Sequence, residues 1–152
     1  CGTGLSGIAF RDCTENMVGI DLSGEMLDRA SGRNVYDTLL QGEIGQVLDG
    51  LAQKFDFFLA ADVVVYFQDL TGLFASIRKK AAREALFVFS TERYDGESFA
   101  VTPTGRTAHS FDYIRTVAER FQFRIMEHIQ IPIRKEKEGW IEGELYLLKL
   151  VE

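Results

Sequence analysis

The hydrophobic and polar positions along the chain fall into short continuous apolar runs and longer stretches with helical spacing. Residues 55–65, which include an unbroken apolar run at residues 57–61, and residues 85–90 have the pattern that a parallel strand buried on both faces requires. Shorter runs at residues 17–20, ending in Asp21, and at residues 39–41 predict two more strands. These runs favour a largely parallel sheet.

Segments with helical character lie between these strands. Ser23 is a suitable N-cap, and the helix that it begins has Glu25 in its first turn. Leu73, Phe74, Ile77 and Ala81 are spaced as on one face of an amphipathic helix. The predicted helical segments cover residues 5–10, 24–31, 70–82 and 111–120, and residues 44–55 are predicted to contain a loop and a helix.

The last part of the chain has a different pattern. Residues 91–107 are polar and contain glycine, which predicts a loop. Residues 121–133 and 143–151 are predicted strands, joined by a polar turn at residues 135–140 into an antiparallel hairpin. Strand–helix alternation followed by a terminal hairpin predicts an α/β fold, a doubly wound sandwich that forms a single domain over residues 1–152.

Composition and charge limit the classes of partner. The chain has 152 residues, a net charge of −6 and a pI near 5.0. A nucleic-acid-binding face is usually basic, so we expect no nucleic acid partner, and we interpret the basic groups at residues 78–80 and 134–137 as solvated surface. No apolar run is long enough to cross a membrane, and the first residues do not resemble a signal peptide.

The cysteines and histidines carry little chemical signal. Cys1 and Cys13 allow one disulfide at most, and His109 and His128 have no partner at metal-ligand spacing. We therefore expect no metal site and a cytoplasmic location.

The residues Gly2-x-Gly4-x-x-Gly7 at the start of the chain match a nucleotide-binding glycine pattern. Glycines let a ligand approach backbone N–H groups and permit tight turns. Asp21, 17 positions after Gly4, is placed at the end of a predicted strand, where a carboxylate can accept hydrogen bonds from both hydroxyls of a ribose. Two cofactor classes, nicotinamide dinucleotides and S-adenosylmethionine, share this arrangement.

Several motifs together resemble class I S-adenosylmethionine-dependent methyltransferases. Cys1-Gly2-Thr3-Gly4 and residues 18–23 resemble the first two motifs of that family. Gln41-Gly42-Glu43 resembles the third, in which aspartate is more usual than glutamate, and residues 55–66 resemble the fourth. Residues 103–110 and Tyr113 are similar to the methyltransferase domains that follow tetratricopeptide repeats in some bacterial proteins.

The resemblance implies a cofactor site for S-adenosylmethionine. Gly2 and Gly4 would let the backbone approach the methionine part, and Asp21 would hold the ribose hydroxyls. The remaining expected cofactor residues are Leu22, Met26 and Ile44 around the adenine, Glu43 at the adenine amino group, and Ala61 and Asp62 beside the sulfonium and the substrate.

The resemblance also implies features that this sequence lacks. The family pattern begins with an apolar strand and an acidic residue ahead of Cys1. We therefore expect an N-terminally truncated domain whose first central strand is missing, preceded in the natural protein by further residues such as helices or a repeat region. The Pro-Gly-Gly turn of the family is replaced by Ala82-Arg83-Glu84, which predicts a simpler turn.

The expected activity is methyl transfer to a small molecule or a protein side chain. A general base is needed only if the nucleophile arrives protonated, and the candidates are Glu92, Tyr94, His109 and Tyr66. Residues 92–110 are expected to form a substrate lid. Two alternatives stay open: a non-catalytic methyltransferase-like scaffold, and an NAD(P)-binding oxidoreductase domain, against which the terminal hairpin argues.

Overall fold

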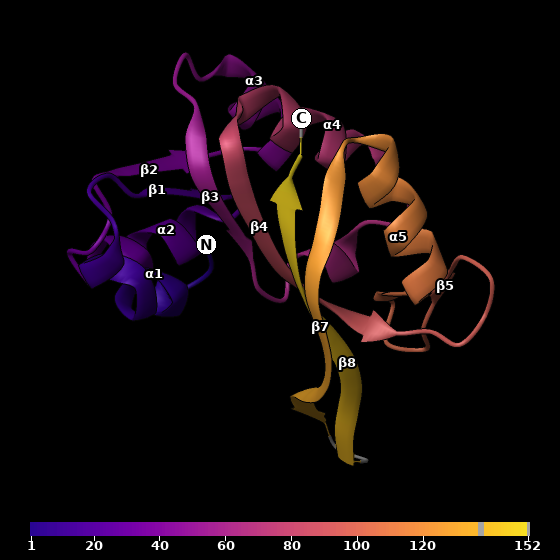
Figure 1. Cartoon of the computed structure of the whole chain (residues 1–152). Coiled ribbons are helices and arrows are strands. Elements are labelled where there is room, and N and C mark those ends of the chain that lie inside the picture. Colours follow the sequence, from indigo (N-terminus) through magenta and orange to yellow (C-terminus); the bar gives the residue numbers. More distant parts are fainter. Residues whose placement is uncertain (137–138, 152) are drawn as a thin grey trace. The chain divides into compact units, whose positions relative to one another are not determined.

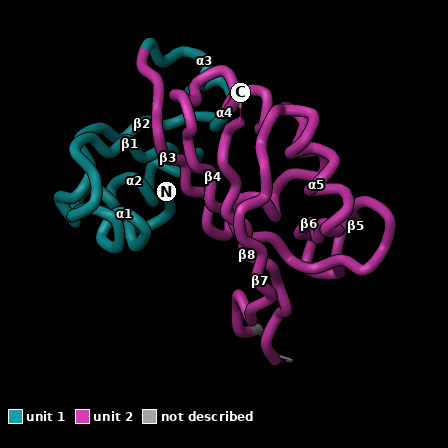
Figure 2. Tube along the Cα trace, viewed as in Figure 1, with its two compact units in different colours: residues 1–52 teal, residues 53–152 magenta. Residues whose placement is uncertain are grey.

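The computed structural model describes residues 1–136 and 139–151, and it contains two compact units, Cys1–Ala52 and Gln53–Glu152. Figure 2 colours the two units separately. In residues 1–136 and 139–151, no helix combines the length and the apolar character that a membrane span requires.

The first unit contains a two-stranded parallel sheet and three α-helices. Strand β1 pairs with β2 in register from Val18↔Thr38 to Asp21↔Gln41. The predicted strands and helices are all present, with ends shifted by a few residues. The elements are α1 (Leu5–Phe10), a 3₁₀ turn η1 (Arg11–Cys13), β1 (Val18–Asp21), α2 (Gly24–Ser31), β2 (Thr38–Gln41) and α3 (Ile44–Gly50).

The second unit is built on a six-stranded sheet. Strand β4 has the central place: it pairs in parallel with β3 and β6 and antiparallel with β8. Strands β7 and β8 form the predicted antiparallel hairpin, which Figure 1 shows extending beyond the rest of the sheet. The elements are β3 (Phe55–Ala60), η2 (Val64–Tyr66), α4 (Thr71–Lys80), β4 (Ala81–Arg93), β5 (Phe99–Val101), β6 (Thr107–His109), α5 (Phe111–Arg120), β7 (Phe123–Glu136) and β8 (Gly139–Leu150).

An aromatic cluster forms the core of the second unit. The ring of Phe74 on α4 makes edge-to-face contacts with Phe87, Phe89 and Phe123 of the sheet, with centroids 5.4–6.0 Å apart. Phe89 stacks on Tyr146 at 5.1 Å, and all these side chains are buried. The cluster therefore anchors the middle of β4 and leaves its carboxyl end, near Glu92, to carry polar groups.

The strand predicted for residues 55–65 is too long. Strand β3 ends at Ala60, and the chain turns at Asp62, whose φ of 54° lies in the left-handed region. Val64 and Val65 are fully buried in a 3₁₀ turn. A buried turn needs apolar residues as much as a buried strand does, so the apolar pattern alone does not show where β3 ends.

The turn predicted at residues 82–84 is also wrong, because these residues belong to β4. The pairs Phe55↔Ala81 and Phe57↔Leu86 are separated by two residues on β3 and five on β4, so β4 has three extra residues there. Glu84 adopts a φ of 58° within this irregular segment. No apolar pattern marks such an insertion.

Two further predictions of irregular structure need correction. The predicted loop over residues 91–107 contains the end of β4, all of β5 and the start of β6. In the predicted turn at residues 135–140, Lys135 pairs with Trp140 and Glu136 with Gly139, and residues 137–138 lie outside the described residues. Strands β5 and β6 have only three residues each, which is too short for a periodic pattern to distinguish them from a loop.

Candidate cofactor and acceptor site

The glycine loop before α1 adopts the backbone that its sequence predicts. Gly2 and Gly4 have φ angles of 56° and 85°, which residues other than glycine rarely adopt. A Cβ on Gly4 would lie 3.2 Å from the Cα of Ala30, whereas a Cβ on Gly2 would meet no atom within 4 Å. Gly4 is therefore required for packing, and Gly2 leaves open space beside the backbone.

The carboxylate of Asp21 connects the end of β1 to the glycine loop. One oxygen accepts the backbone N–H of Gly2 at 2.7 Å, and the other accepts the N–H of Ser23 at 2.9 Å. Partial burial raises the pKa of Asp21, but the hydrogen bonds from Ser23 and Gly2 and the ammonium group of Cys1, 3.2 Å away, together lower it by more. Asp21 is thus held as an anion at the place where the sequence predicts a ribose contact.

The residues predicted to flank the adenine lie beside this anion. Leu22 directly follows Asp21 and is 70% exposed, which leaves an apolar side chain open to solvent at the end of a strand. Ser23 caps α2 by accepting the N–H of Met26, whose own side chain is half-buried. The first turn of α2 therefore holds Met26 four positions after Leu22.

Glu43 has a local structural task in addition to the predicted one. Its two carboxylate oxygens accept the N–H groups of Gly45 and Gln46, at 3.0 and 2.8 Å, so that Glu43 is the N-cap of α3. Ile44 follows as the first residue of that helix and is half-buried. Either aspartate or glutamate can accept hydrogen bonds from the N–H groups at a helix N-terminus. This capping task explains why glutamate can replace the more usual aspartate at position 43.

In the second unit, Ala61 and Asp62 are exposed residues that follow the carboxyl end of β3. The N–H of Asp62 donates to Ser90 Oγ at 2.9 Å, which joins this turn to β4. Its carboxylate Oδ1 accepts from Arg106 at 2.8 Å and from Arg134 at 3.1 Å. Asp62 is therefore the centre of an ionic cluster at this end of the sheet.

Glu92 is the second acid of the cluster. It is only 4% exposed, and its carboxylate forms an ion pair with the guanidinium of Arg134. Arg106 also lies over the ring of Tyr66, 5.3 Å from its centroid, while Tyr66 itself is 67% exposed. The cluster of Asp62, Glu92, Arg106 and Arg134 brings two of the predicted site residues together.

His109 lies elsewhere, in the interior of the second unit. Its ring is fully buried and stacked on Tyr113. Nε2 lies 3.2 Å from the carbonyl oxygen of Gln68, so this nitrogen carries the proton, and Nδ1 accepts from Thr91 Oγ1 at 2.8 Å. Burial lowers the pKa of His109 despite the backbone hydrogen bond, which keeps the ring neutral. Tyr94, the remaining candidate, is half-buried.

The geometry of His109 also limits the expected lid. Residues 107–110 are buried, and β5 and β6 pair with each other between Phe99↔His109 and Val101↔Thr107. The segment of residues 92–110 is therefore anchored at its C-terminal end.

Sequence reasoning missed the two arginines of the ionic cluster. The sequence pattern predicts a solvated basic face at Arg134, yet its side chain is only 16% exposed and forms ion pairs with Glu92 and Asp62. Arg106 lies inside the family-like stretch of residues 103–110, which was its only signal. In the described part of the chain, no three His, Cys, Asp or Glu side chains gather as a metal site.

Comparisons with known proteins agree with this geometry. The profile of a family described as "Methyltransferase domain" matches residues 1–89. A methyltransferase structure from Clostridium acetobutylicum superimposes over 100% of this chain and 82% of that chain, with a TM-score of 0.76 and 18% identity. The N-methyltransferase NodS from Bradyrhizobium japonicum, solved with S-adenosyl-L-homocysteine, covers 99% of this chain and 74% of its own, with a TM-score of 0.76 and 19% identity. These likenesses confirm the predicted fold.

A curated protein adds a match in sequence. The 18S rRNA (guanine-N(7))-methyltransferase of Bos taurus is 38% identical over 64 residues, which are 42% of this chain and 23% of that protein. The match therefore spans less than a quarter of that relative. Because the family profile covers more than half of the residues, the chain belongs to the methyltransferase domain family, and its fold is that of the class I S-adenosylmethionine-dependent enzymes.

Proposed function

We propose that this protein binds S-adenosylmethionine and transfers its methyl group to a small molecule or a protein side chain. The observation that carries the proposal is the bonding of Asp21: an ionised carboxylate at the end of β1 that accepts the N–H of Gly2, next to open space at that glycine. A carboxylate can accept hydrogen bonds from the hydroxyls of a ribose, and the open backbone at the glycine leaves room for the methionine part of the cofactor.

The surrounding residues fit the chemistry of the cofactor. The exposed Leu22 and the half-buried Met26 and Ile44 offer apolar contacts to an adenine, and Glu43 offers carboxylate oxygens to its amino group. Gly4 would keep the loop in the shape that lets its backbone approach the methionine part. Ala61 and Asp62 would line the sulfonium and substrate side of the site.

The protein needs to supply little beyond position. S-adenosylmethionine supplies a methyl group that is already activated by the sulfonium: the carbon–sulfur bond breaks as the bond to the nucleophile forms, and the electron pair stays on sulfur. Holding the nucleophile about 3 Å from the methyl carbon in line contributes roughly 7–11 kcal/mol. We infer that the fixed cluster around Asp62 positions the acceptor rather than deprotonating it, because its carboxylates already hold arginines.

The acidic charge of −6 supports a small molecule or a protein as the acceptor. A nucleobase nitrogen is the second candidate. The 38% identity to a protein named as an 18S rRNA guanine-N7 methyltransferase favours it. The resemblance of residues 103–110 and Tyr113 to domains that follow tetratricopeptide repeats supports a third element of the proposal, a repeat region elsewhere in the full-length protein.

Calorimetric titration with S-adenosylhomocysteine tests cofactor binding. We expect binding by the wild-type protein and a loss of at least tenfold in affinity for D21A. Asp28 is an exposed aspartate of α2, so D28A serves as the matched control and should bind normally. A thermal shift with NAD but none with S-adenosylhomocysteine would instead indicate the oxidoreductase alternative.

Transfer is tested with S-adenosylmethionine labelled in its methyl group. The full-length protein is incubated separately with pools of small metabolites, with proteins and with ribosomal RNA, and the labelled pool identifies the acceptor class. Binding of S-adenosylhomocysteine with no labelled product in any pool would favour the non-catalytic scaffold.

A further inference from the structure

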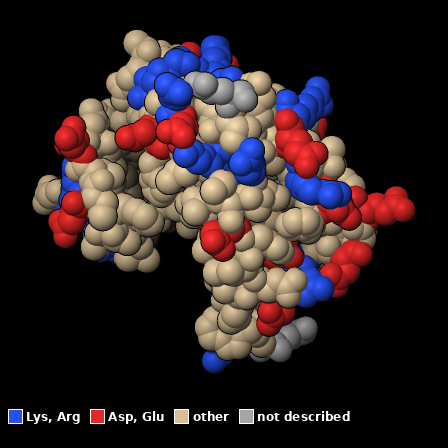
Figure 3. All heavy atoms as spheres, in the orientation of Figure 1, with Lys and Arg blue, Asp and Glu red and all other residues tan. Residues whose placement is uncertain are grey.

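A half-open pocket of about 270 Å³ lies in the second unit, at the end of the sheet where β4 begins. Its polar lining comes from Arg83 and Glu84 on β4, Arg124 on β7 and Lys149 on β8, and its apolar wall includes Met126 and Leu150. Three positive side chains and one negative side chain line it, which gives a net charge of +2 in a protein whose total charge is −6. Figure 3 shows Lys and Arg side chains gathered near this end of β8.

The strand register places like charges directly opposite each other. Arg124 and Lys149 are Cα partners on the antiparallel strands β7 and β8. Like charges in this arrangement destabilise a sheet, so an isolated pair of this kind is unfavourable. Glu84 neutralises Lys149 through an ion pair of 2.6 Å, whereas the guanidinium of Arg124 has no hydrogen bond or ion pair with a side chain that the structure describes.

The backbone departs from regular strand geometry on two sides of the pocket. Strand β4 has its three extra residues between Ala81 and Leu86, and Glu84 there has a φ of 58°. Strand β7 has a bulge at Met126, between the pairs of Ile125 and Glu127. Bulges redirect side chains and are frequent beside binding sites, and left-handed backbone at a non-glycine residue carries a cost in stability. Both irregularities turn residues toward the same pocket.

We propose that this pocket binds a small ligand with a dianionic oxyanion head, of the phosphate monoester class, and a short apolar body. The guanidinium of Arg124 would form paired hydrogen bonds with the oxygens, since this geometry suits phosphate. The cations of the lining outnumber its one anion, which favours an anionic head group. Met126 and Leu150 would contact the carbon body of the ligand.

The pocket is separate from the acceptor cluster. Arg83 and Glu92 are nine residues apart on β4, which corresponds to roughly 30 Å of extended strand. Binding here is therefore independent of the proposed methyl transfer, and either proposal can fail without the other.

Calorimetric titrations with inorganic phosphate and with phenyl phosphate test the proposal. We expect both to bind the wild-type protein, phenyl phosphate the more tightly because its ring contacts the apolar wall. R124Q should bind both at least tenfold more weakly. Arg115, an exposed arginine on α5, gives the matched control R115Q, which should bind like the wild type.

A second variant guards against an effect of R124Q on folding. K149M removes the opposing charge, and we expect it to weaken phosphate binding at least threefold while the circular dichroism spectrum stays unchanged. Absence of phosphate and phenyl phosphate binding to the wild-type protein would overturn the proposal, as would unchanged affinity in R124Q. Tighter binding of a single-stranded oligonucleotide than of phenyl phosphate would also overturn it, in favour of a polyanion surface.

Discussion

The carboxylate of Asp21 accepts the backbone N–H of Gly2 at 2.7 Å, across 19 positions of sequence. Its second oxygen holds Ser23, the N-cap of α2. The residue that is proposed to bind the ribose therefore also fixes the glycine loop on one side and the next helix on the other. A substitution at Asp21 should consequently affect the ligand and the loop together.

We predict that D21N lowers the affinity for S-adenosylhomocysteine at least tenfold. The amide of asparagine has one acceptor oxygen, so it can hold either Gly2 or Ser23 but turns an N–H donor toward the other. Calorimetry of D21N beside D28N separates this effect from a general loss of charge. Equal affinities of D21N and the wild type would contradict the proposed role of Asp21.

Asp21 also predicts a dependence of stability on acid. Its folded-state pKa lies below the ordinary value of 3.8, so its stabilising contribution is present above that value and is lost as the pH falls through the lower folded-state pKa. The difference in unfolding free energy between the wild type and D21N should therefore be larger at pH 6 than at pH 2.5. Urea titrations at the two pH values measure this difference in unfolding free energy. A difference that is larger at pH 2.5 than at pH 6 would contradict the stabilising role of the Asp21 carboxylate.

The ion pair of Glu92 and Arg134 predicts a large effect from a single change. Glu92 is buried, so R134Q would leave its carboxylate without its cation, and losing one partner of a buried pair costs about 3–5 kcal/mol. Arg93 and Asp95 form an exposed pair next to it in sequence, and R93Q should cost only about 0–1 kcal/mol. Urea unfolding of both variants makes the comparison, and similar costs would show that the buried pair is not specially important.

The α/β fold could be predicted because apolar runs and caps are local signals. Ser23 as an N-cap and residues 85–90 as a buried strand both appear in the structure. The insertion at Glu84 and the early end of β3 at Ala60 could not be predicted, since both depend on backbone angles that no apolar pattern encodes. The local sequence pattern therefore predicts which helices and strands form better than it predicts the residues at which they end.

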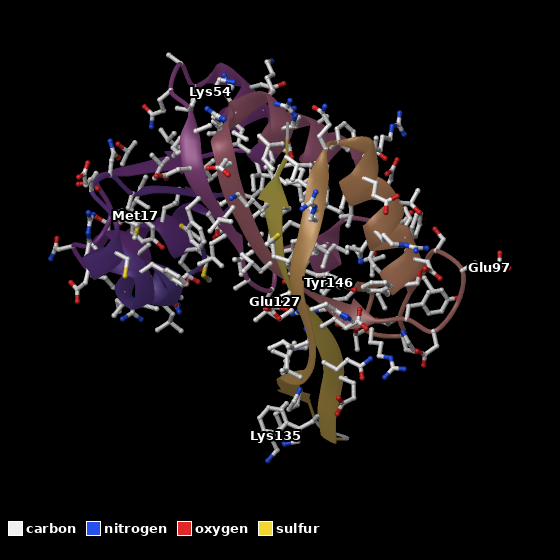
Figure 4. The ribbon with its side chains drawn as sticks, viewed as in Figure 1. Met17, Lys54, Glu97, Glu127, Lys135 and Tyr146 are labelled. Carbon is white, nitrogen blue, oxygen red and sulfur yellow. The ribbon has the colours of Figure 1, made fainter. Side chains whose placement is uncertain are left out.

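The site divides in the same way. Gly2 and Gly4 lie in the first motif and Asp21 in the second, and a hydrogen bond from the N–H of Gly2 to Asp21 connects the two motifs. Arg134 is 72 positions from Asp62. The basic group at residues 134–137 gives no sign in the sequence that Arg134 forms ion pairs with buried or distant carboxylates. Figure 4 shows Lys135, the neighbour of Arg134, near the outer end of the hairpin. Successive side chains of a strand point to opposite faces, so Arg134 can reach the acids of the cluster while its neighbour Lys135 does not share that face.

His109 predicts a second dependence on pH, and it bears on catalysis. Because burial depresses its folded-state pKa, the unfolded chain takes up the proton first, and stability is lost as the pH falls from about 6.5 through the folded-state value. H109Q should remove this loss between pH 7.5 and 5.5 while costing about 1–3 kcal/mol at pH 7.5, since Thr91 and Gln68 lose their partner.

The same variant tests whether His109 is a general base. A buried ring with both nitrogens occupied cannot accept a proton from an acceptor in this conformation, so the H109Q enzyme should keep its rate of methyl transfer within about threefold once folded. A loss of 10² or more in rate, the order expected for a general base, would restore His109 as a catalytic candidate.

Gly2 and Gly4 give a comparison of two glycines in one loop. Both have left-handed backbone, so an alanine at either position should cost roughly 1–2 kcal/mol. At Gly4 the new Cβ would also lie 3.0 Å from Arg33 Cδ and 3.2 Å from Ala30 Cα, and overpacking adds about 1–3 kcal/mol. We therefore predict that G4A is the less stable variant in urea unfolding. G2A has open space around its Cβ, so it should lose only the roughly 1–2 kcal/mol of the backbone strain. It should nevertheless bind S-adenosylhomocysteine at least tenfold more weakly, because the added methyl group would occupy the volume proposed for the ligand. If G2A binds normally while G4A does not, the open space beside Gly2 is not where the cofactor lies.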